Sequence, residues 1–214
     1  GRFWSAVGRT GLFTMISVPL SVAGGFAIAC LINRLTWGRI VYRTFFLIPM
    51  VIAPSIAGLI FRFILNYDFG LVNQLLAKIG LSRVNFLGTS TAAFQSIILV
   101  DLWQWIPFAV LVFIAGLETL PLELFEAARI DGASGLRIFW YVTLPLMKKF
   151  ILITALFRFV QCIRVYDIVK LMTDGGPGVS TELLNVYVTK IGFSWFDLGY
   201  ASALAFFVLN LGTL

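Results

Sequence analysis

The residues of this chain best suited to binding a polar solute include four that recur at every third position in one apolar segment. They are Arg158, Gln161, Arg164 and Asp167. A spacing of three places side chains along one slowly winding face of a helix. Ionisable groups are costly in an apolar run and usually face a cavity or a partner, so the pattern predicts a polar path beside this helix.

Two other interpretations of these residues stay open. Arg164 and Asp167 could pair at i, i+3 and simply hold the end of the helix. The two arginines could bind an anionic solute, because guanidinium groups match phosphate, sulfonate and carboxylate oxygens. They could equally bond an acid on a neighbouring subunit.

A second group of chemically capable residues lies in an earlier apolar segment. It consists of Asp101, Trp103, Gln104 and Trp105. This mixture suits a polyol, because aromatic rings pack on its C–H faces while amides and charges pair with its hydroxyl groups. Trp103 and Trp105 point to different faces of a helix, so at most one is expected to line a path. The residues predicted for the path from this group are Trp103 and Gln104.

The elements that carry these residues are expected to be membrane helices. Hydrophobic residues make up 60% of the 214 positions and charged residues only 12%, whereas soluble domains are about 45–50% apolar. The net charge of +6 does not indicate nucleic acid, because Lys and Arg stand singly at the ends of apolar runs, as membrane-interface anchors do. Cys30 and Cys162 lie within apolar runs and histidine is absent, so neither a disulfide framework nor a metal site is predicted.

Five apolar stretches have the length of a membrane-spanning helix or begin to reach it. They are residues 12–33, 44–65, 92–117, 150–172 and 199 onward. Continuous runs of this length predict helices. The expected fold class is all-α, a polytopic transmembrane helical bundle, in a single domain over residues 1–214 that we expect to be truncated at both ends. Pro49, Pro54 and Pro107 are expected to kink the second and third spans.

A polar interruption separates the third and fourth spans at residues 118–149. Pro121 suits the first turn of a helix, and helix-forming residues follow it. Gly132 or Gly135 can adopt the positive φ that turns the chain back, and a second amphipathic helix is expected before Pro145 breaks it. The expected product is a helix–turn–helix against the membrane face, which a lipid-embedded chain does not need unless a partner docks on it.

This interruption contains the sequence EAARIDGASGLRIFWYVTLPL at residues 126–146. The sequence resembles the Glu-Ala-Ala loop of membrane permease subunits of binding-protein-dependent ABC importers, especially the sugar branch related to maltose and glycerol-phosphate permeases. Further stretches agree and extend the resemblance over nearly the whole chain. They are FWSAVGRTGLFTMISVPLS at residues 3–21, NRLTWGRIVYRTFFLIP at 33–49, and VYDIVKLMTDGGPGVSTELLNVYV with GYASAL between 165 and 204.

The resemblance implies that the loop at 118–149 is cytoplasmic and couples the chain to an ATP-hydrolysing subunit. Lys and Arg counts divide evenly between the two sides and do not decide the orientation. The residues expected to form this contact, or to return the chain to the bilayer after it, are Glu126, Ala127, Ala128, Asp131, Gly132, Leu144 and Pro145. Small alanines permit close approach, and acidic side chains can meet basic groups on the partner.

The resemblance also implies the partners and the location. The partners are a second homologous permease subunit, two ATP-binding subunits and an extracytoplasmic solute-binding protein, in the bacterial cytoplasmic (inner) membrane. Residues 62–91 and 172–197 would receive the binding protein, or would be plain connectors. The chain has no GxxxxGK[ST] phosphate loop, so no cofactor is expected in it, and ATP and Mg are expected on the ATPase subunits. The solute implied is a sugar or a sugar derivative.

Two other functions remain open at this point. The chain could be an ion-coupled secondary transporter of a polar solute, with Asp101 or Asp167 as a proton or sodium site. It could also be a membrane-embedded enzyme, although no nucleophile motif or metal-ligand cluster emerges. Dependence on a co-expressed ATPase would distinguish an importer from a secondary transporter. Product formation without translocation would indicate a membrane-embedded enzyme.

Overall fold

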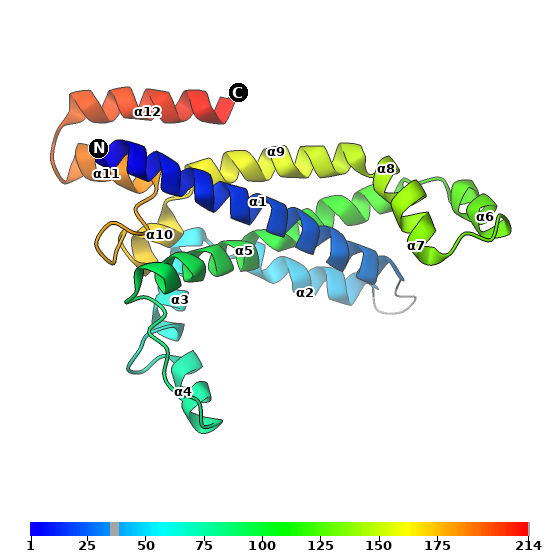
Figure 1. Cartoon of the computed structure of the whole chain (residues 1–214), viewed down its shortest axis with the longest axis horizontal. Helices are drawn as coiled ribbons and strands as arrows, with labels where there is room; N and C mark the ends of the chain where they lie inside the picture. Colours follow the sequence, from blue (N-terminus) through cyan, green and yellow to red (C-terminus); the bar gives the residue numbers. More distant parts are fainter. Residues whose placement is uncertain (35–38, 214) are drawn as a thin grey trace.

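Three helices lie side by side along the long axis of the molecule and form its body (Figure 1). They are α1 (Arg2–Arg34), α5 (Ser90–Glu118) and α9 (Lys148–Arg164). The computed structural model describes residues 1–34 and 39–213, and this part of the chain contains no β-strand. The predicted all-α fold is therefore confirmed.

The first predicted span begins earlier than expected, and the turn after it is described only in part. α1 begins at Arg2 rather than at residue 12. The turn at 33–49 includes residues 35–38, which lie outside the described residues. The side chains of Arg34, Arg39 and Arg43 also lie outside the described residues. They are among the Lys and Arg residues counted in the attempt to predict the orientation in the membrane.

The second predicted span, residues 44–65, is wrong as a single helix. The chain instead forms α2 (Arg39–Val51) and α3 (Pro54–Ile64), and these meet at a bend of 95°. Pro54 begins α3, because proline has no N–H to donate and disfavours a helical conformation in the residue before it. The kink predicted at Pro54 is thus a complete break between two helices.

The fourth predicted span, residues 150–172, is also divided. α9 ends at Arg164, Val165 is extended (φ −59°, ψ 130°), and a separate short helix, α10, covers Asp167–Met172. The last predicted span corresponds to α12 (Leu198–Thr213), which is apolar but shorter than a full crossing.

Among the described residues, two helices are long and apolar enough to cross a membrane. They cover Arg2–Asn33 and Ser90–Glu118, and the bent pair α2 and α3 supplies a third crossing if it counts as one span. The long helices pack closely where small residues meet. A Cβ atom added to Gly25 of α1 would overlap Ala109 of α5, so glycine is required at this contact.

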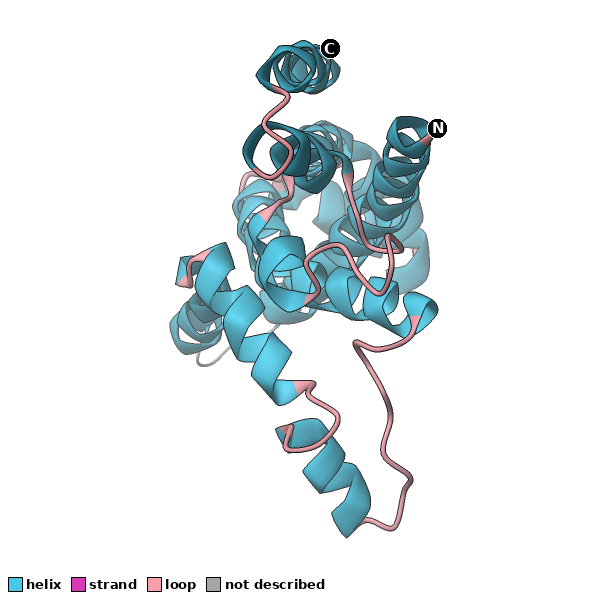
Figure 2. Cartoon of the chain, turned by 90° about the vertical axis from the view of Figure 1, so that its left-hand side faces the viewer, coloured by secondary structure: helices cyan, strands magenta, loops and turns pink. Residues whose placement is uncertain are grey.

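The two ends of the bundle carry different elements (Figures 1 and 2). One end carries α6 (Leu122–Ile130) and α7 (Gly135–Ile138), and the other carries α3, α4 (Leu71–Lys78), α10 and α11 (Leu184–Phe193). α3 packs on α10, and α11 packs on α12 and on α1. The apolar core follows α1 and α5 along their whole length, with Phe13 and Ile97 buried toward one end and Phe26 and Phe113 toward the other.

The second half of the polar interruption does not break at Pro145, contrary to the prediction. After α7 the helical path continues through a π-helical stretch (Phe139–Thr143) and α8 (Leu144–Leu146), and only a turn at Met147 separates it from α9. Pro145 lies in the first turn of α8, where its missing N–H costs nothing.

Candidate coupling and translocation sites

α6 and α7 form an exposed projection at one end of the bundle. Pro121 occupies the N-cap position of α6, and neither α6 nor α7 contains a buried residue. Gly132 has φ +73°, in the left-handed region that favours glycine, and it turns the chain between the two helices. Of the two glycines predicted for this bend, Gly132 is the one that makes it.

A cleft of about 730 Å³ lies between this projection and the ends of α1 and α5. Glu126 and Arg129 of α6 line it, together with Gly135 and Phe139 from the second half of the loop. Within the described part of the chain, neither Glu126 nor Asp131 forms an ion pair. Glu126 therefore presents a carboxylate beside a hollow surface, without an ion-pair partner among the described residues.

The apolar side chains of this projection are also largely uncovered. Ile130 is 86% exposed and Leu136 is 71% exposed. Ala127 is exposed and Ala128 is half-buried. Because both side chains are small, another chain can approach the helix closely beside Glu126. Exposed apolar patches of this kind mark interaction sites.

Leu144 and Pro145 differ in their surroundings. Leu144 packs against a core cluster that includes the buried Phe113 and Met147, whereas Pro145 is exposed. Leu144 thus anchors the returning chain to the bundle, and it connects the projection mechanically to α5 and α9.

The bundle interior contains a buried ion pair between α5 and α9. Arg158 is 0% exposed, and its Nη2 atom donates to the carboxylate of Asp101, which is 1% exposed. The Nε atom of Arg158 donates to Ser21 Oγ of α1 at 3.1 Å, and its guanidinium lies 5.4 Å from the centre of the Trp105 ring. Arg158 therefore connects three helices inside the subunit and is covered on all sides by this chain.

Gln104 and Trp103 lie on α5, near the break between α2 and α3. Gln104 is buried, and its Nε2 atom donates to the carbonyl oxygen of Ile52 at 2.8 Å. This carbonyl lies at the break, where the regular helical bonding is interrupted. Trp103 is half-buried, packs edge-on against Phe61 with ring centres 4.9 Å apart, and lines an apolar cleft of about 400 Å³ with Pro49.

The four residues predicted to follow one helical face do not do so. Arg158 and Gln161 lie on α9 and Arg164 ends it, whereas Asp167 begins the separate helix α10. Gln161 is half-buried, and Arg164 and Asp167 are exposed. Within the described residues Arg164 and Asp167 form no ion pair with each other. Arg164 lines a cleft of about 430 Å³ between α9, α11 and α12.

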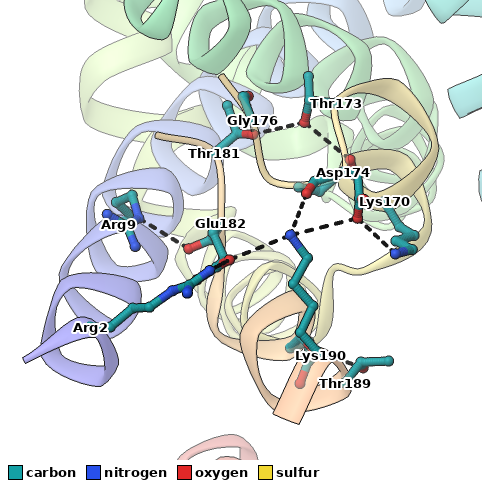
Figure 3. A network of polar contacts seen from close by, with 12 residues as sticks. Arg2, Arg9, Lys170, Thr173, Asp174, Gly176, Thr181, Glu182, Thr189 and Lys190 are labelled. Atoms are coloured by element: carbon teal, nitrogen blue, oxygen red, sulfur yellow. Dashed lines mark hydrogen bonds and ion pairs between the residues drawn. The ribbon is translucent and has the colours of Figure 1, made fainter. Parts of the chain in front are cut away.

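A network of charged residues at the opposite end from α6 was not predicted from the sequence (Figure 3). Its centre is Glu182, a buried residue in the loop before α11. Arg2 of α1 donates to both carboxylate oxygens of Glu182, at 2.9 and 2.7 Å, and Arg9 donates to its backbone carbonyl at 3.0 Å. Arg2 and Glu182 lie 180 positions apart, so no local sequence pattern predicts their contact.

Lys190 extends this network to the loop after α10. Its Nζ atom donates to the carbonyl of Asp174 at 2.6 Å and lies 3.5 Å from the Glu182 carboxylate. Burial raises the pKa of Glu182, but hydrogen bonds and positive charge from Arg2, joined by the charge of Lys190, outweigh it and hold the pKa below its usual range. The network therefore fastens the start of α1 to the α10–α11 loop.

A helical bundle with long apolar helices, a buried intramembrane ion pair and an uncovered helical projection defines a polytopic membrane protein. The chain belongs to the family described as the binding-protein-dependent transport system inner membrane component, whose model matches residues 21–214. The predicted family and the predicted multi-pass, inner-membrane location are confirmed. As a member of a transport family, the chain is a transport subunit and not an enzyme.

Three relatives illustrate the likeness. The chain is 38% identical over 204 residues to a probable ABC transporter permease protein of Sinorhizobium fredii. It is 38% identical over 206 residues to the sulfoquinovosyl glycerol transport system permease protein of Agrobacterium fabrum, and 36% identical over 198 residues to the trehalose/maltose transport system permease protein of Thermococcus litoralis. These matches cover 95%, 95% and 92% of this chain, and the chain spans 66% of the length of each relative.

Solved structures share the fold. A crystal structure of a bacterial ABC transporter involved in the import of the acidic polysaccharide alginate matches with a TM-score of 0.87 at 22% identity, covering 97% of this chain and 75% of that chain. A second structure, of the bacterial alginate ABC transporter in complex with an alginate pentasaccharide-bound periplasmic protein, matches with a TM-score of 0.86 at 22% identity, with the same coverage.

Proposed function

We propose that this chain is the permease subunit of an ATP-driven importer that passes a sugar or sugar derivative across the membrane. The observation that carries the proposal is the exposed helix α6, which holds Glu126 over a cleft at one end of the bundle. Family membership supports it, as do relatives named for the transport of sulfoquinovosyl glycerol and of trehalose and maltose. The segment 118–149 is then the coupling loop of a single transmembrane domain.

The partners follow from this role. Two ATP-binding subunits hold ATP and Mg, and one of them receives α6 through Glu126, Ala127, Ala128 and Asp131. A second, homologous permease subunit completes the path. A solute-binding protein docks at the opposite end, on the loops between α3 and α5 and between α10 and α11. A solved structure of the same fold, in complex with an alginate pentasaccharide-bound periplasmic protein, supports a binding-protein partner.

The coupling mechanism follows from the way the projection joins the bundle. α5 leads into α6 after a short loop, and a nearly continuous helical path runs from α7 to α9. When the ATPase subunits close on ATP, displacement of α6 is passed to α5 and α9, which rock between inward-facing and outward-facing arrangements. Bound solute favours one arrangement through its differential contacts.

The solute path is lined, in this proposal, by the predicted residues that reach the surface of the subunit. These are Trp103, Gln161, Arg164 and Asp167. Arg158 and Gln104 are covered by this chain, so they position the helices around the path. The ion-coupled alternative loses one of its two candidate ion sites, because the carboxylate of Asp101 is held by Arg158.

Solute-stimulated ATP hydrolysis by the reconstituted assembly tests the proposal. The panel contains neutral and anionic sugars, each supplied with the binding protein, and the variants are Glu126→Lys, Glu123→Lys and Arg164→Ala. Glu126 lines the cleft and Glu123 does not, so Glu126→Lys should reduce stimulation by about tenfold or more, equivalent to about 1.4 kcal/mol of coupling. Glu123→Lys, the matched charge reversal on the same helix, should have a smaller effect.

Arg164→Ala separates the two kinds of solute in the same assay. Selective loss of stimulation by anionic sugars places Arg164 beside the solute. Normal stimulation in Glu126→Lys, in an assembly that still contains the ATPase subunits, would refute the coupling role of α6.

A further inference from the structure

The chain between α3 and α5 forms an arm that projects sideways from the bundle (Figures 1 and 2). We call residues 66–88 the α4 arm, because α4 (Leu71–Lys78) is its helix. The arm leaves the bundle at the end of α3 and returns to it at the start of α5. Both of its ends are therefore attached where an apolar helix of the bundle begins or ends.

A single buried side chain holds the α4 arm together. Asn73 is 1% exposed, and its Oδ1 atom accepts a hydrogen bond from the backbone N–H of Val84 at 2.8 Å. Its Nδ2 atom donates to the carbonyl oxygens of Val84 at 3.0 Å and Asn66 at 3.2 Å. These bonds join the segment that enters the arm, at Asn66, to the segment that leaves it, at Val84. The arm therefore presents a fixed surface.

One face of α4 is apolar and uncovered. Leu71, Leu75 and Ile79 follow one another at intervals of four residues and therefore share a face. Their exposed fractions are 55%, 53% and 70%. We call these three residues the α4 stripe. Asn73, by contrast, points into the arm, so the stripe lies on the side of α4 that faces away from the rest of the arm.

The residues around the stripe are basic and aromatic. Lys78 and Arg83 are exposed and form no ion pair within the described residues. Asp68 is the sole acidic residue of the 66–88 sequence, so the arm carries an excess of one positive charge. Tyr67 and Phe69 are 45% and 56% exposed. An apolar stripe flanked by basic and aromatic residues is typical of a helix that lies in the interface of a membrane.

We propose that the α4 stripe lies in the interfacial layer of the lipid bilayer, on the side opposite α6, and anchors the arm there. The chain is an inner-membrane component, and the arm extends sideways from the bundle. It therefore lies above lipid, with Lys78 and Arg83 placed to meet phosphate groups. This inference does not depend on the transport role, because it concerns only the α4 stripe. The binding protein proposed above would meet the sides of the α4 arm that face away from the bilayer.

Spin labels on two sides of α4 test the proposal. Leu75→Cys labels the stripe, and Ala77→Cys is the matched control on the opposite side of the same helix. The subunit is purified with its associated subunits and reconstituted in bilayers of phosphatidylethanolamine and phosphatidylglycerol. Labelled wild type supplies the background from Cys30 and Cys162, and Ile79→Cys replaces Leu75→Cys if that variant does not assemble. The readout is collision of each label with oxygen, which concentrates in lipid, and with a water-soluble nickel chelate.

The label at Leu75 should collide several times more often with oxygen than with the nickel chelate, and the label at Ala77 should show the reverse ratio. A Leu75 label that favours the nickel chelate would mean that the stripe faces water, and the proposal would be wrong. A Leu75 label shielded from both reagents would mean that another protein subunit covers the stripe, and this outcome also overturns the proposal.

Discussion

At the residue scale, Asp101 and Arg158 are the charges that the apolar interior has to accommodate. Removing two ions from water costs several kcal/mol each, and their attraction offsets that cost only when the geometry is good. Arg158 meets this condition in part, through Asp101, Ser21 and the ring of Trp105, while its Nη1 atom is buried without a hydrogen-bond partner among the described residues. The pair therefore adds little to net stability. Its main effect is to specify how α1, α5 and α9 pack against one another.

Breaking this pair from one side should be costly. Asp101→Ala or Arg158→Ala leaves a single buried charge, so each should lower the free energy of unfolding by about 3–5 kcal/mol. The double variant Asp101→Leu with Arg158→Met removes both charges and should recover most of that loss. Thermal unfolding in detergent measures all three. Single variants that unfold at the wild-type temperature would show that the pair does not form.

Glu182 makes the subunit sensitive to acid. Its folded-state pKa is held below the ordinary value of 4.5, so its contribution to stability is present above that pH and is lost as the pH falls through the lower folded-state value. Wild-type protein should lose thermal stability below pH 4.5 more steeply than Glu182→Gln, which cannot titrate there. The measurement is the unfolding midpoint against pH. Parallel curves for the two proteins would contradict the assignment.

At the element scale, the contact between α1 and α5 depends on one glycine. A Cβ at Gly25 would overlap Ala109, whereas a Cβ at the neighbouring Gly24 would meet only the Ile106 side chain, at 3.4 Å from its Cδ1 atom. Gly25→Ala should therefore separate the helices and destabilise the subunit by about 1–3 kcal/mol, the usual cost of overpacking. Gly24→Ala should be nearly neutral. Unfolding midpoints compare the two, and equal effects would mean that the helices do not approach at Gly25.

The elements also show where sequence patterns were sufficient. Long apolar runs predicted α1 and α5, because any continuous helix in lipid must satisfy its backbone internally. The same composition describes a straight span and a bent pair equally well, so residues 44–65 predicted a kink at Pro54 but not a complete break with a 95° bend. Pro145 was predicted to break a helix, but it lies in a first turn that proline tolerates.

At the scale of the whole molecule, local patterns were informative and distant contacts were not. The helix α6 after Pro121 and a glycine bend after it follow from residues close together in the chain, and the sequence predicted both, with Gly132 as one of two candidates for the bend. The partner of Arg158 is 57 residues away and that of Arg2 is 180 residues away. Only the packing of α1 against α5, α9 and the α10–α11 loop brings these groups together.

The most direct test of the account is uptake of labelled sugar by proteoliposomes that contain the assembly, with binding protein present on the side opposite α6. ATP is supplied only on the side that carries α6. We predict uptake that requires this ATP, persists when ion gradients are abolished, and is lost in Glu126→Lys. Uptake that continues without ATP and follows an ion gradient would contradict the assignment as an ATP-driven importer.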